Sequence, residues 1–342
     1  RKDKATTQEE NMLVERRSVN FNTFDTTPCL EATLNDIDTK LFVNEYLPKA
    51  INEDVLIGDK RNIKEQMASL RLYNLTYDCP TYAAIILFGK NPKYFLFGNY
   101  IQYVNFGGTN NASSILNEKV FEGNLMTLLP RIDAFIEDSL IIARPVPISN
   151  LREKTVRNYP KWAIRELVMN ALMHRDYKTN TPIKLYQYID RLEITNAGGL
   201  YGNARPENFP FVNDYRNPII AEALRVLGYV NKFNRGITMV QEELQENGNN
   251  KAVFDVSKLT VFLVTVNDRT TTKTTTKTTT KTTTKIIELI INNPHISRQE
   301  LSEIIGISIN GINWHIKRLK ANGILTREGG RKRGKWIINE NK

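Results

Sequence analysis

RELVMNALMHRDY, residues 165–177, is the stretch that constrains the fold most strongly. On a helix, Glu166, Asn170 and His174 follow one another at i, i+4 and i+8, so their side chains form one stripe. The residues around them are mostly apolar, and a helix that is apolar nearly all round is normally buried. A carboxylate, an amide and an imidazole on a buried helix must be satisfied by partners. We therefore expect the stripe to face either a charged ligand, such as a metal–phosphate group, or a neighbouring loop.

Two strand patterns follow this helix. IKLYQYID, residues 183–190, and RLEITNAGGL, residues 191–200, are predicted to be two adjacent strands with a turn at Asp190–Arg191. The second strand runs into a glycine-rich loop that contains Asn196, Gly198 and Gly199. Such a loop lets the backbone approach a ligand closely.

Beyond the loop, the sequence predicts two helices and a closing strand or strand pair. The helix RNPIIAEALRVLG has Asn217 as its expected N-cap and a proline at its first position. NRGITMVQEEL places Gly236 near a helix start, where backbone N–H groups can receive an anion. FDVSKLTVFLVTV, residues 254–266, completes the pattern. Together with the polar stripe, these features indicate nucleotide binding.

Residues 1–150 form a mixed α/β region in our sequence interpretation. AAIILFG, residues 83–89, is predicted to be a buried strand closed by its glycine, and residues 99–108 a second strand. The segment from Val120 is typical of a helix that Pro130 kinks. We find no catalytic constellation here, and we interpret the aromatic residues as core rather than as a ligand cage.

Charge separates the last part of the chain from the rest. The 342 residues carry a net charge of +10, and residues 270–342 hold 14 Lys/Arg and 5 Asp/Glu, so this tail carries +9 and the body +1. Such a distribution is typical of a nucleic-acid-binding module attached to a neutral body. Hydrophobic residues are 41% of the chain, which is enough for ordinary cores in two or three domains.

Targeting signals and membrane spans are not expected. No run approaches 18 apolar residues, and the polar start RKDKATTQEE has no apolar signal-peptide region. Cys29 and Cys79 match no metal spacing and suggest a reducing cytoplasm. Because the chain does not begin with Met, we expect a piece of a longer protein.

A Thr/Lys repeat, residues 269–285, links the body to the tail. TTTKTTTKTTTK has no apolar residue and cannot bury a core, so we expect an extended tether. Its lysines can also contact phosphates weakly.

The segment after this linker, residues 286–342, has the order helix, helix, turn, helix and basic hairpin. SRQE at 297–300 has the form of a capping box, Gly306 is placed to end the second helix, and Ser308 to cap the third. This order predicts a winged helix-turn-helix that binds double-stranded DNA, with protein contacts or dimerisation as the alternative. The predicted DNA-contacting residues lie on the third helix and in the wing: Asn310, Asn313, Lys317, Lys320, Arg331, Lys332 and Arg333.

The body resembles a known family. YPKWAIRELVMNALMHRDY, DRLEITNAGGL, RNPIIAEAL and RGITMV occur in order, and they resemble a divergent GHKL-type ATPase domain of bacterial ATP-binding transcriptional regulators. That family is often compared with the C-terminal part of RecG helicase. The resemblance covers roughly residues 15–268, with FDTTPCLEATLNDID and YAAIILFGKNPKYF included. It implies a GHKL-like α/β sandwich over residues 151–268, within an α+β multidomain fold. Family members commonly carry an N-terminal Schlafen/AlbA-type domain, and this chain is expected to start after it.

The resemblance also implies roles for individual residues. Asn170 matches the amide that ligates Mg²⁺ between nucleotide phosphates, and Glu166 matches the carboxylate that polarises the attacking water. Asn196 stands where the wider superfamily recognises adenine with an Asp. Gly198 and Gly199 would admit the base and ribose. The implied cofactors are thus ATP and Mg²⁺.

The phosphate side departs from the family pattern. Gly236 matches the last glycine of a G-x-G, but Asn234 replaces the first one and Asn231 stands where relatives often have an acid. Asn tolerates a left-handed backbone, and Arg235 is expected to compensate by holding a phosphate itself. The alternative is a former ATPase fold in which His174, Arg175 and Asp176 cap a loop. A helicase motor is not expected, because no G-x-x-x-x-G-K-[ST] occurs.

The sequence therefore predicts a cytoplasmic bacterial DNA-binding regulator. In it, ATP–Mg²⁺ binding by the body would change how two copies pair and so the spacing of two winged helices. Two alternatives stay open: a weak ATPase that acts in DNA repair or defence, and a scaffold or regulator that binds no nucleotide.

Overall fold

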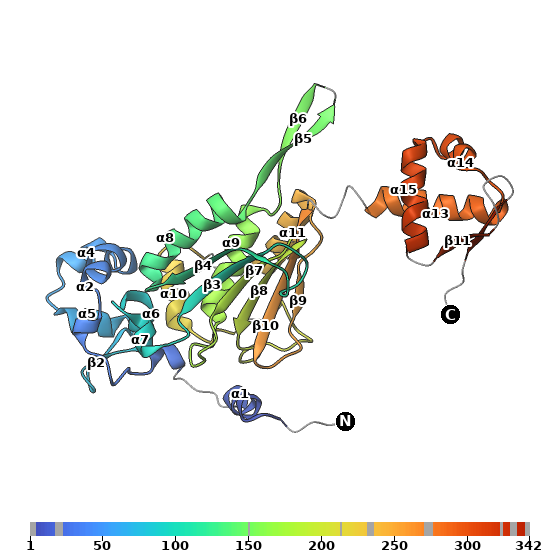
Figure 1. Ribbon diagram of the computed structural model, residues 1–342. Helices are drawn as coiled ribbons and strands as arrows, with labels where there is room; N and C mark the ends of the chain where they lie inside the picture. The colour runs from blue at the N-terminus through green and yellow to red at the C-terminus, as the bar shows by residue number, and fades with distance from the viewer. Residues whose placement is uncertain are drawn as a thin grey trace. The chain divides into compact units, whose positions relative to one another are not determined.

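The chain divides into two compact units, Arg1–Thr270 and Thr271–Lys342, which we call the body and the tail. Each is described by itself (Figure 1). The structure is a computed structural model, and it describes residues 5–17, 23–149, 151–212, 214–230, 236–269, 276–321, 324–328 and 334–338.

One mixed sheet organises the body. Its strand order is β4-β3-β7-β8-β10-β9, in which β3 and β7 are parallel and the other neighbours antiparallel. Strands from both sides of residue 150 share this sheet, so the boundary that we drew there does not separate two bodies. The strands are β3 (Tyr100–Phe106), β4 (Ile115–Glu122), β7 (Ile183–Gln187), β8 (Arg191–Ala197), β9 (Val253–Asp255) and β10 (Val261–Asn267).

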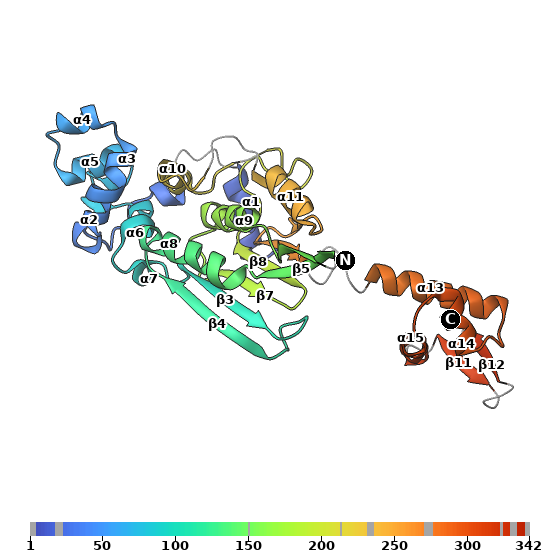
Figure 2. The ribbon, with the colours of Figure 1, turned by 90° about the horizontal axis from the view of Figure 1, so that it is seen from above.

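Helices cover one face of this sheet, and the buried core lies between the two layers (Figure 2). The central helix carries the RELVMNALMH stretch, and its burial matches the prediction from its apolar surroundings: Ala163, Ile164 and Val168 are fully buried. The covering helices are α8 (Leu125–Phe135) with the π-helical turn η4 (Ile136–Leu140), α9 (Lys161–His174), α10 (Pro218–Val226) and α11 (Gly236–Asn247).

The predicted strand at residues 83–89 is wrong, because this segment forms helix α6 (Tyr82–Phe88). All residues from Ala83 to Phe88 are buried, so the sequence shows neither a helical nor a strand period there. The hydroxyl of Thr81 accepts a hydrogen bond from the Ala84 N–H at 3.5 Å and caps the helix. The predicted strand at residues 99–108 is confirmed as β3.

The segment from Val120 also begins differently from the prediction. It continues strand β4 to Glu122, and α8 starts at Leu125, where the Asn124 side chain accepts from the Thr127 N–H at 3.0 Å. Pro130 lies inside α8, as predicted.

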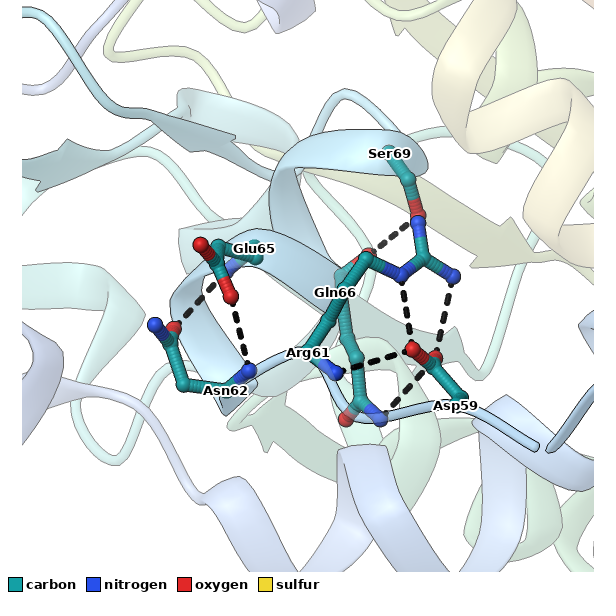
Figure 3. A network of polar contacts seen from close by, with 6 residues as sticks. All are labelled: Asp59, Arg61, Asn62, Glu65, Gln66 and Ser69. Carbon is teal, nitrogen blue, oxygen red and sulfur yellow. Dashed lines mark hydrogen bonds and ion pairs between the residues drawn. The ribbon is translucent and has the colours of Figure 1, made fainter. Parts of the chain in front are cut away.

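Small elements before β3 pack against the same core. The side chains of Asn62 and Glu65 form a capping box at one helix start, and the Arg61 guanidinium binds Asp59 with two hydrogen bonds of 2.8 and 3.0 Å (Figure 3). These elements are η1 (Phe24–Thr26), η2 (Leu34–Asp36), α2 (Thr39–Leu41), η3 (Phe42–Tyr46), α3 (Leu47–Ala50), α4 (Glu53–Ile57), α5 (Ile63–Ser69), β1 (Tyr73–Asn74), β2 (Cys79–Pro80) and α7 (Pro92–Phe95). Helix α1 (Thr7–Arg17) precedes them, and its described side chains are mostly exposed.

A two-stranded hairpin, β5 (Ala143–Ser149) and β6 (Arg152–Arg157), extends away from the sheet and its helices (Figure 1). Its strands pair only with each other. Nearly all of its residues are exposed.

The tail begins with a helix that includes the end of the Thr/Lys repeat. We expected the repeat to be extended, but α13 spans Thr276–Asn292, so residues 276–285 are helical and the boundary at 286 falls inside a helix. Ile286 and Ile290 anchor α13 in the tail core. Because adding a residue to an existing helix costs much less than starting one, the threonines can continue it despite their poor propensity.

The predicted winged helix-turn-helix order is present in the tail. The Ser297–Glu300 capping box is formed, Gly306 ends the second helix with φ +75°, and the Ser308 hydroxyl accepts from the Gly311 N–H at 3.2 Å. The elements are α14 (Arg298–Ile305), α15 (Ile309–Ala321) and the antiparallel strands β11 (Leu325–Glu328) and β12 (Lys335–Ile338).

The α+β multidomain fold class is therefore confirmed. Among the described residues, no helix has the length and apolar character needed to cross a membrane.

Candidate functional site

A cavity of about 410 Å³ lies in the body beside α9, with further walls from β8, β10, α11 and residues 198–215. Pockets for small molecules and cofactors commonly measure roughly 300–1,000 Å³. The cavity is mostly apolar, with a few polar groups, as such sites usually are.

The three polar residues of the α9 stripe all line this cavity, so one wall carries Glu166, Asn170 and His174. The amide nitrogen of Asn170 donates to Oε1 of Glu166 at 3.2 Å. Burial raises the pKa of the Glu166 carboxyl, while the hydrogen bond from Asn170 and the nearby Arg165 act in the opposite direction. Because Asn170 uses its nitrogen here, its oxygen is the atom with which it would ligate a cation.

His174 is held as a neutral ring at the end of the stripe. Its imidazole stacks on Tyr215 with a centroid separation of 5.6 Å and an interplanar angle of 12°. Burial and the charge of Arg216 lower the pKa of His174 to about 4, against a smaller opposing effect of Asp214. The ring is therefore uncharged at neutral pH.

Arg175 and Asp176, which the alternative interpretation assigned to capping a loop, have different partners in the described part of the chain. Asp176 pairs with Arg216 at 3.9 Å. The buried Arg175 guanidinium instead donates from Nη2 to the carbonyl oxygens of Gly98 and Thr181 at 2.7 and 2.9 Å. Arg175 thus ties the end of α9 to the segments that precede β3 and β7, which is a structural role.

Asn196 is one of the residues that line the cavity. Its Nδ2 donates to the Ala171 carbonyl at 3.0 Å, and this bond fixes the orientation of the amide. Its Oδ1 is buried and has no hydrogen-bond partner in the described part of the chain. A buried acceptor without a partner costs about 1–3 kcal/mol, which a ligand that donates an N–H would recover.

Gly198 and Gly199 line the cavity, but the chain itself explains why Gly199 must be glycine. A Cβ on Gly199 would lie 2.6 Å from the carbonyl oxygens of Lys258 and Leu259. The N–H of Gly199 donates to Leu259 O, and that of Gly198 to Thr260 O, both at 2.8 Å. The glycine loop therefore continues the pairing of β8 with the segment before β10.

Gly236 is the first residue of α11 and packs directly against the stripe. A Cβ at this position would overlap Oε1 of Glu166. The absence of a side chain at Gly236 thus lets α11 begin beside the carboxylate. Arg235, together with Asn231 and Asn234, lies outside the described residues.

The sequence interpretation made no prediction about the aromatic residues that form one wall of this cavity. Phe209, Phe254 and Phe262 contact one another with ring-centroid distances of 5.4, 5.8 and 6.2 Å. Phe262 lies directly opposite Asn196 in the β8–β10 ladder. Only that register brings the aromatic wall and the predicted base-binding amide together, so no local motif could have identified it.

In the tail, the exposed side of α15 carries the predicted DNA-binding residues. Asn310, Lys317 and Lys320 are exposed, and Asn313 is half-buried, with its Oδ1 accepting from Nη1 of Arg298 at 3.0 Å. The buried side consists of Ile312, Ile316 and Leu319.

The remaining predicted DNA-binding residues belong to the wing, and two aromatic residues of α15 lie beside the predicted ones. Arg331, Lys332 and Arg333 of the wing lie outside the described residues. His315 is buried, and its Nδ1 lies 2.9 Å from the Thr283 hydroxyl, so it does not face the solvent. Trp314, which the sequence interpretation did not single out, is 48% exposed on α15.

Each of the two units contains a segment that matches the model of a known family. Residues 180–266 match the family described as "Putative ATP-dependent DNA helicase recG C-terminal". The body contains a RecG C-terminal-like domain. Residues 279–326 match the family "Winged helix-turn-helix DNA-binding", so the predicted resemblance is confirmed for both parts. Asn196, Gly198, Gly199 and Gly236 fall within the first match, whereas α9 precedes it.

A solved structure shares the fold. The DIP2311 protein from Corynebacterium diphtheriae is similar with a TM-score of 0.53 at 16% identity, over 98% of this chain and 68% of that one. No curated protein matches the chain.

Proposed function

We propose that the protein binds ATP–Mg²⁺ in the cavity beside α9, binds double-stranded DNA through its tail, and regulates transcription. The unpartnered Oδ1 of Asn196 carries the nucleotide part of this proposal. It is a fixed, buried acceptor on a residue that lines a cavity of ligand size, and the 6-amino group of adenine is a donor of the kind it lacks. The RecG C-terminal-like and winged-helix matches support the two halves of the proposal.

The part of the cavity near Glu166 and Gly236 suits phosphates. The oxygens of Asn170 and Glu166 are hard ligands of the kind that Mg²⁺ prefers. Gly236 is the first described residue of α11, and N–H groups near a helix start attract anions. Among the described residues, no group of three or more His, Cys, Asp and Glu is placed to bind a metal. We therefore expect Mg²⁺ to be bound together with the nucleotide phosphates rather than by a separate protein site.

Bound ATP–Mg²⁺ would supply an activated phosphoryl group and a cation that neutralises it. The contribution of this chain would be Glu166, which can accept a proton from water only as a carboxylate. Because burial raises the pKa of this carboxyl, any hydrolysis should increase with pH as the carboxylate forms. A regulator requires binding only, and hydrolysis would reset it.

We propose that nucleotide binding changes how two copies of this chain form a dimer. Winged-helix proteins commonly read two half-sites as dimers, and the spacing of the half-sites must match that of the two helices. If ATP–Mg²⁺ changes how two bodies associate, it changes which spacing is bound tightly. The homodimer is thus part of the proposal, and sedimentation with and without ATP–Mg²⁺ tests it.

Titration calorimetry with ATP and Mg²⁺ tests the nucleotide site. Asn170→Ala should weaken ATP–Mg²⁺ binding by roughly 10- to 100-fold, as is usual when a metal site loses a ligand or its support. Asn196→Leu removes the unpartnered acceptor and should reduce the preference for ATP over ITP, which lacks the amino group. Asn250→Ala, an exposed residue that does not line the cavity, is the matched control and should bind like the wild type.

The outcomes separate the competing functions. Absence of binding by the wild type would leave a scaffold or regulator without nucleotide. Binding without phosphate release would support the regulator. Turnover that Glu166→Gln abolishes without loss of binding would support an ATPase acting in DNA repair or defence.

A further inference from the structure

The β5–β6 hairpin concentrates the positive charge of the body. Residues 143–157 contain four Arg/Lys and one Glu, a net charge of +3, whereas the body as a whole carries +1. The rest of the body is therefore net negative at −2. Such a contrast on a projecting element is typical of a surface that meets polyanions.

Three of these cations share one face of the hairpin. Side chains two residues apart on a strand point to the same side, so Arg152 and Lys154 lie on one face of β6. Lys154 is opposite Val146, and Arg144 is two residues before Val146 on β5, so Arg144 shares that face. Arg144, Arg152 and Lys154 are exposed and have no ion-pair partner within the described part of the chain.

The far end of the hairpin is apolar. Leu151 is 96% exposed and Ile148 is 56% exposed. Ile148 lies where the ladder register shifts between Pro147 and Ser149, which re-aims side chains at a bulge. Large apolar side chains that project from the end of an isolated hairpin are unfavourable in water and commonly mark a binding surface.

The hairpin has no support from the rest of the body along most of its length. Its residues are exposed apart from Val156, which is buried near the base, and Val146, which is half-buried. A hairpin of two strands is at best marginally stable alone in water. A partner that binds the cationic face would therefore also order the hairpin.

We propose that the β5–β6 hairpin is a second DNA-binding element, which lies along the minor groove of duplex DNA. Its three aligned cations would contact phosphates, and Ile148 and Leu151 would contact the floor of the groove or insert between base steps. Proteins that bind the minor groove combine basic residues with apolar wedges in this way, and a β-ribbon fits a DNA groove. This element belongs to the body and is independent of the nucleotide site and of the winged helix.

The salt dependence of DNA binding by the full chain tests the cationic face. The probe is a fluorescein-labelled 30-base-pair duplex with an A·T-rich centre, titrated by anisotropy between 50 and 200 mM NaCl. Loss of three phosphate contacts in R144Q/R152Q/K154Q should reduce the magnitude of the slope of log K against log[NaCl] by about 2.7. Over this range, the wild type should lose roughly 40-fold more affinity than the variant.

A matched control removes the same charge elsewhere. K49Q/K60Q/K251Q neutralises three exposed lysines of the body outside the hairpin and should retain the wild-type slope. Circular dichroism and thermal unfolding of both variants should match the wild type, because all the substituted residues are exposed.

Two further measurements test the groove and the tip. Saturating the duplex with netropsin, which occupies the minor groove, should lower the wild-type slope to that of R144Q/R152Q/K154Q. I148S/L151S should reduce DNA bending, measured by energy transfer between the duplex ends, while the slope is retained. An unchanged slope in the cationic variant would overturn the proposal. A loss of dimer mass in that variant, with an unchanged slope, would assign the hairpin to a protein contact instead.

Discussion

Helices α9 and α15 carry similar polar side chains but present them to different surroundings. In α9, the stripe of Glu166, Asn170 and His174 lines a cavity, and burial shifts the pKa of the acid and of the imidazole. In α15, Asn310 and Lys317 lie on an exposed side of the helix. Side chains that line a cavity can contact a ligand of cavity size, whereas side chains on an exposed helix surface can contact a macromolecule. Asparagine, which both helices carry, therefore lies in a cavity wall on α9 and on an open surface on α15.

Deleting residues 270–342 should have the largest effect, and it tests whether the tail binds DNA while the body binds nucleotide. The truncated body should lose at least 1,000-fold in affinity for a specific duplex, because specific binding exceeds non-specific binding by about that factor or more. It should keep wild-type affinity for ATP–Mg²⁺ and a weak, salt-sensitive affinity for DNA through the hairpin. Anisotropy measures the affinity for DNA, and calorimetry measures the affinity for ATP–Mg²⁺. Unchanged affinity for the specific duplex would remove the tail from the interface.

The second largest expected effect is a loss of folding stability when Gly199 in the glycine loop is replaced. Gly199→Ala places a Cβ 2.6 Å from two backbone carbonyl oxygens, which cannot move as a flexible side chain can. Overpacking of this kind typically costs about 1–3 kcal/mol, and we expect the upper end because backbone must shift. Urea unfolding measures the loss. Gly58→Ala, whose Cβ would have only one contact at 3.9 Å, should be nearly neutral. Equal stability of the two variants would contradict the tight loop.

The third test uses the lowered pKa of His174. An unfolded histidine titrates near 6.5, and the folded one near 4, so the unfolded state binds more protons between these values. Stability from the neutral ring is complete above pH 6.5 and is lost as the pH falls toward 4. The wild type should lose on the order of 2 kcal/mol more than His174→Gln across this window.

Unfolding curves of both proteins at pH 7, 5.5 and 4 measure this difference. Glu166 is present in both proteins and acts in the opposite sense, so it cancels in the comparison. Parallel pH profiles would show that the His174 ring is not held neutral by its surroundings.

The smallest expected effect lies in the tail. A Cβ on Gly311 in α15 would meet only ordinary contacts, the nearest at 3.4 Å to Ile307. Because glycine inside a helix costs roughly 0.5–1 kcal/mol relative to alanine, Gly311→Ala should stabilise the tail by that amount. The near-ultraviolet signal of the buried Trp336 follows the tail during unfolding. A lower melting temperature would mean that the site is more crowded than the geometry indicates.

Sequence patterns predicted segments with a clear period or cap. The stripe on α9, strands β7 and β8, and the capping box of α14 were all predicted, because each depends on residues close in sequence. The segment at 83–89 was wrongly predicted as a strand, because a fully buried element has no polar face to reveal its period. Thr81, the cap of that helix, was the local signal that could have corrected it.

By itself, the sequence determined which residues are chemically able to bind a ligand and which end of the chain is basic. Residue type, helical spacing and charge are local properties, so they can be deduced without coordinates. Only the tertiary structure decided what those residues face. The shared sheet across residue 150, the pairing of Phe262 with Asn196 and the placing of Gly236 against Glu166 join segments far apart in the chain. Their contacts depend on strand register and helix packing, which no short stretch of sequence specifies.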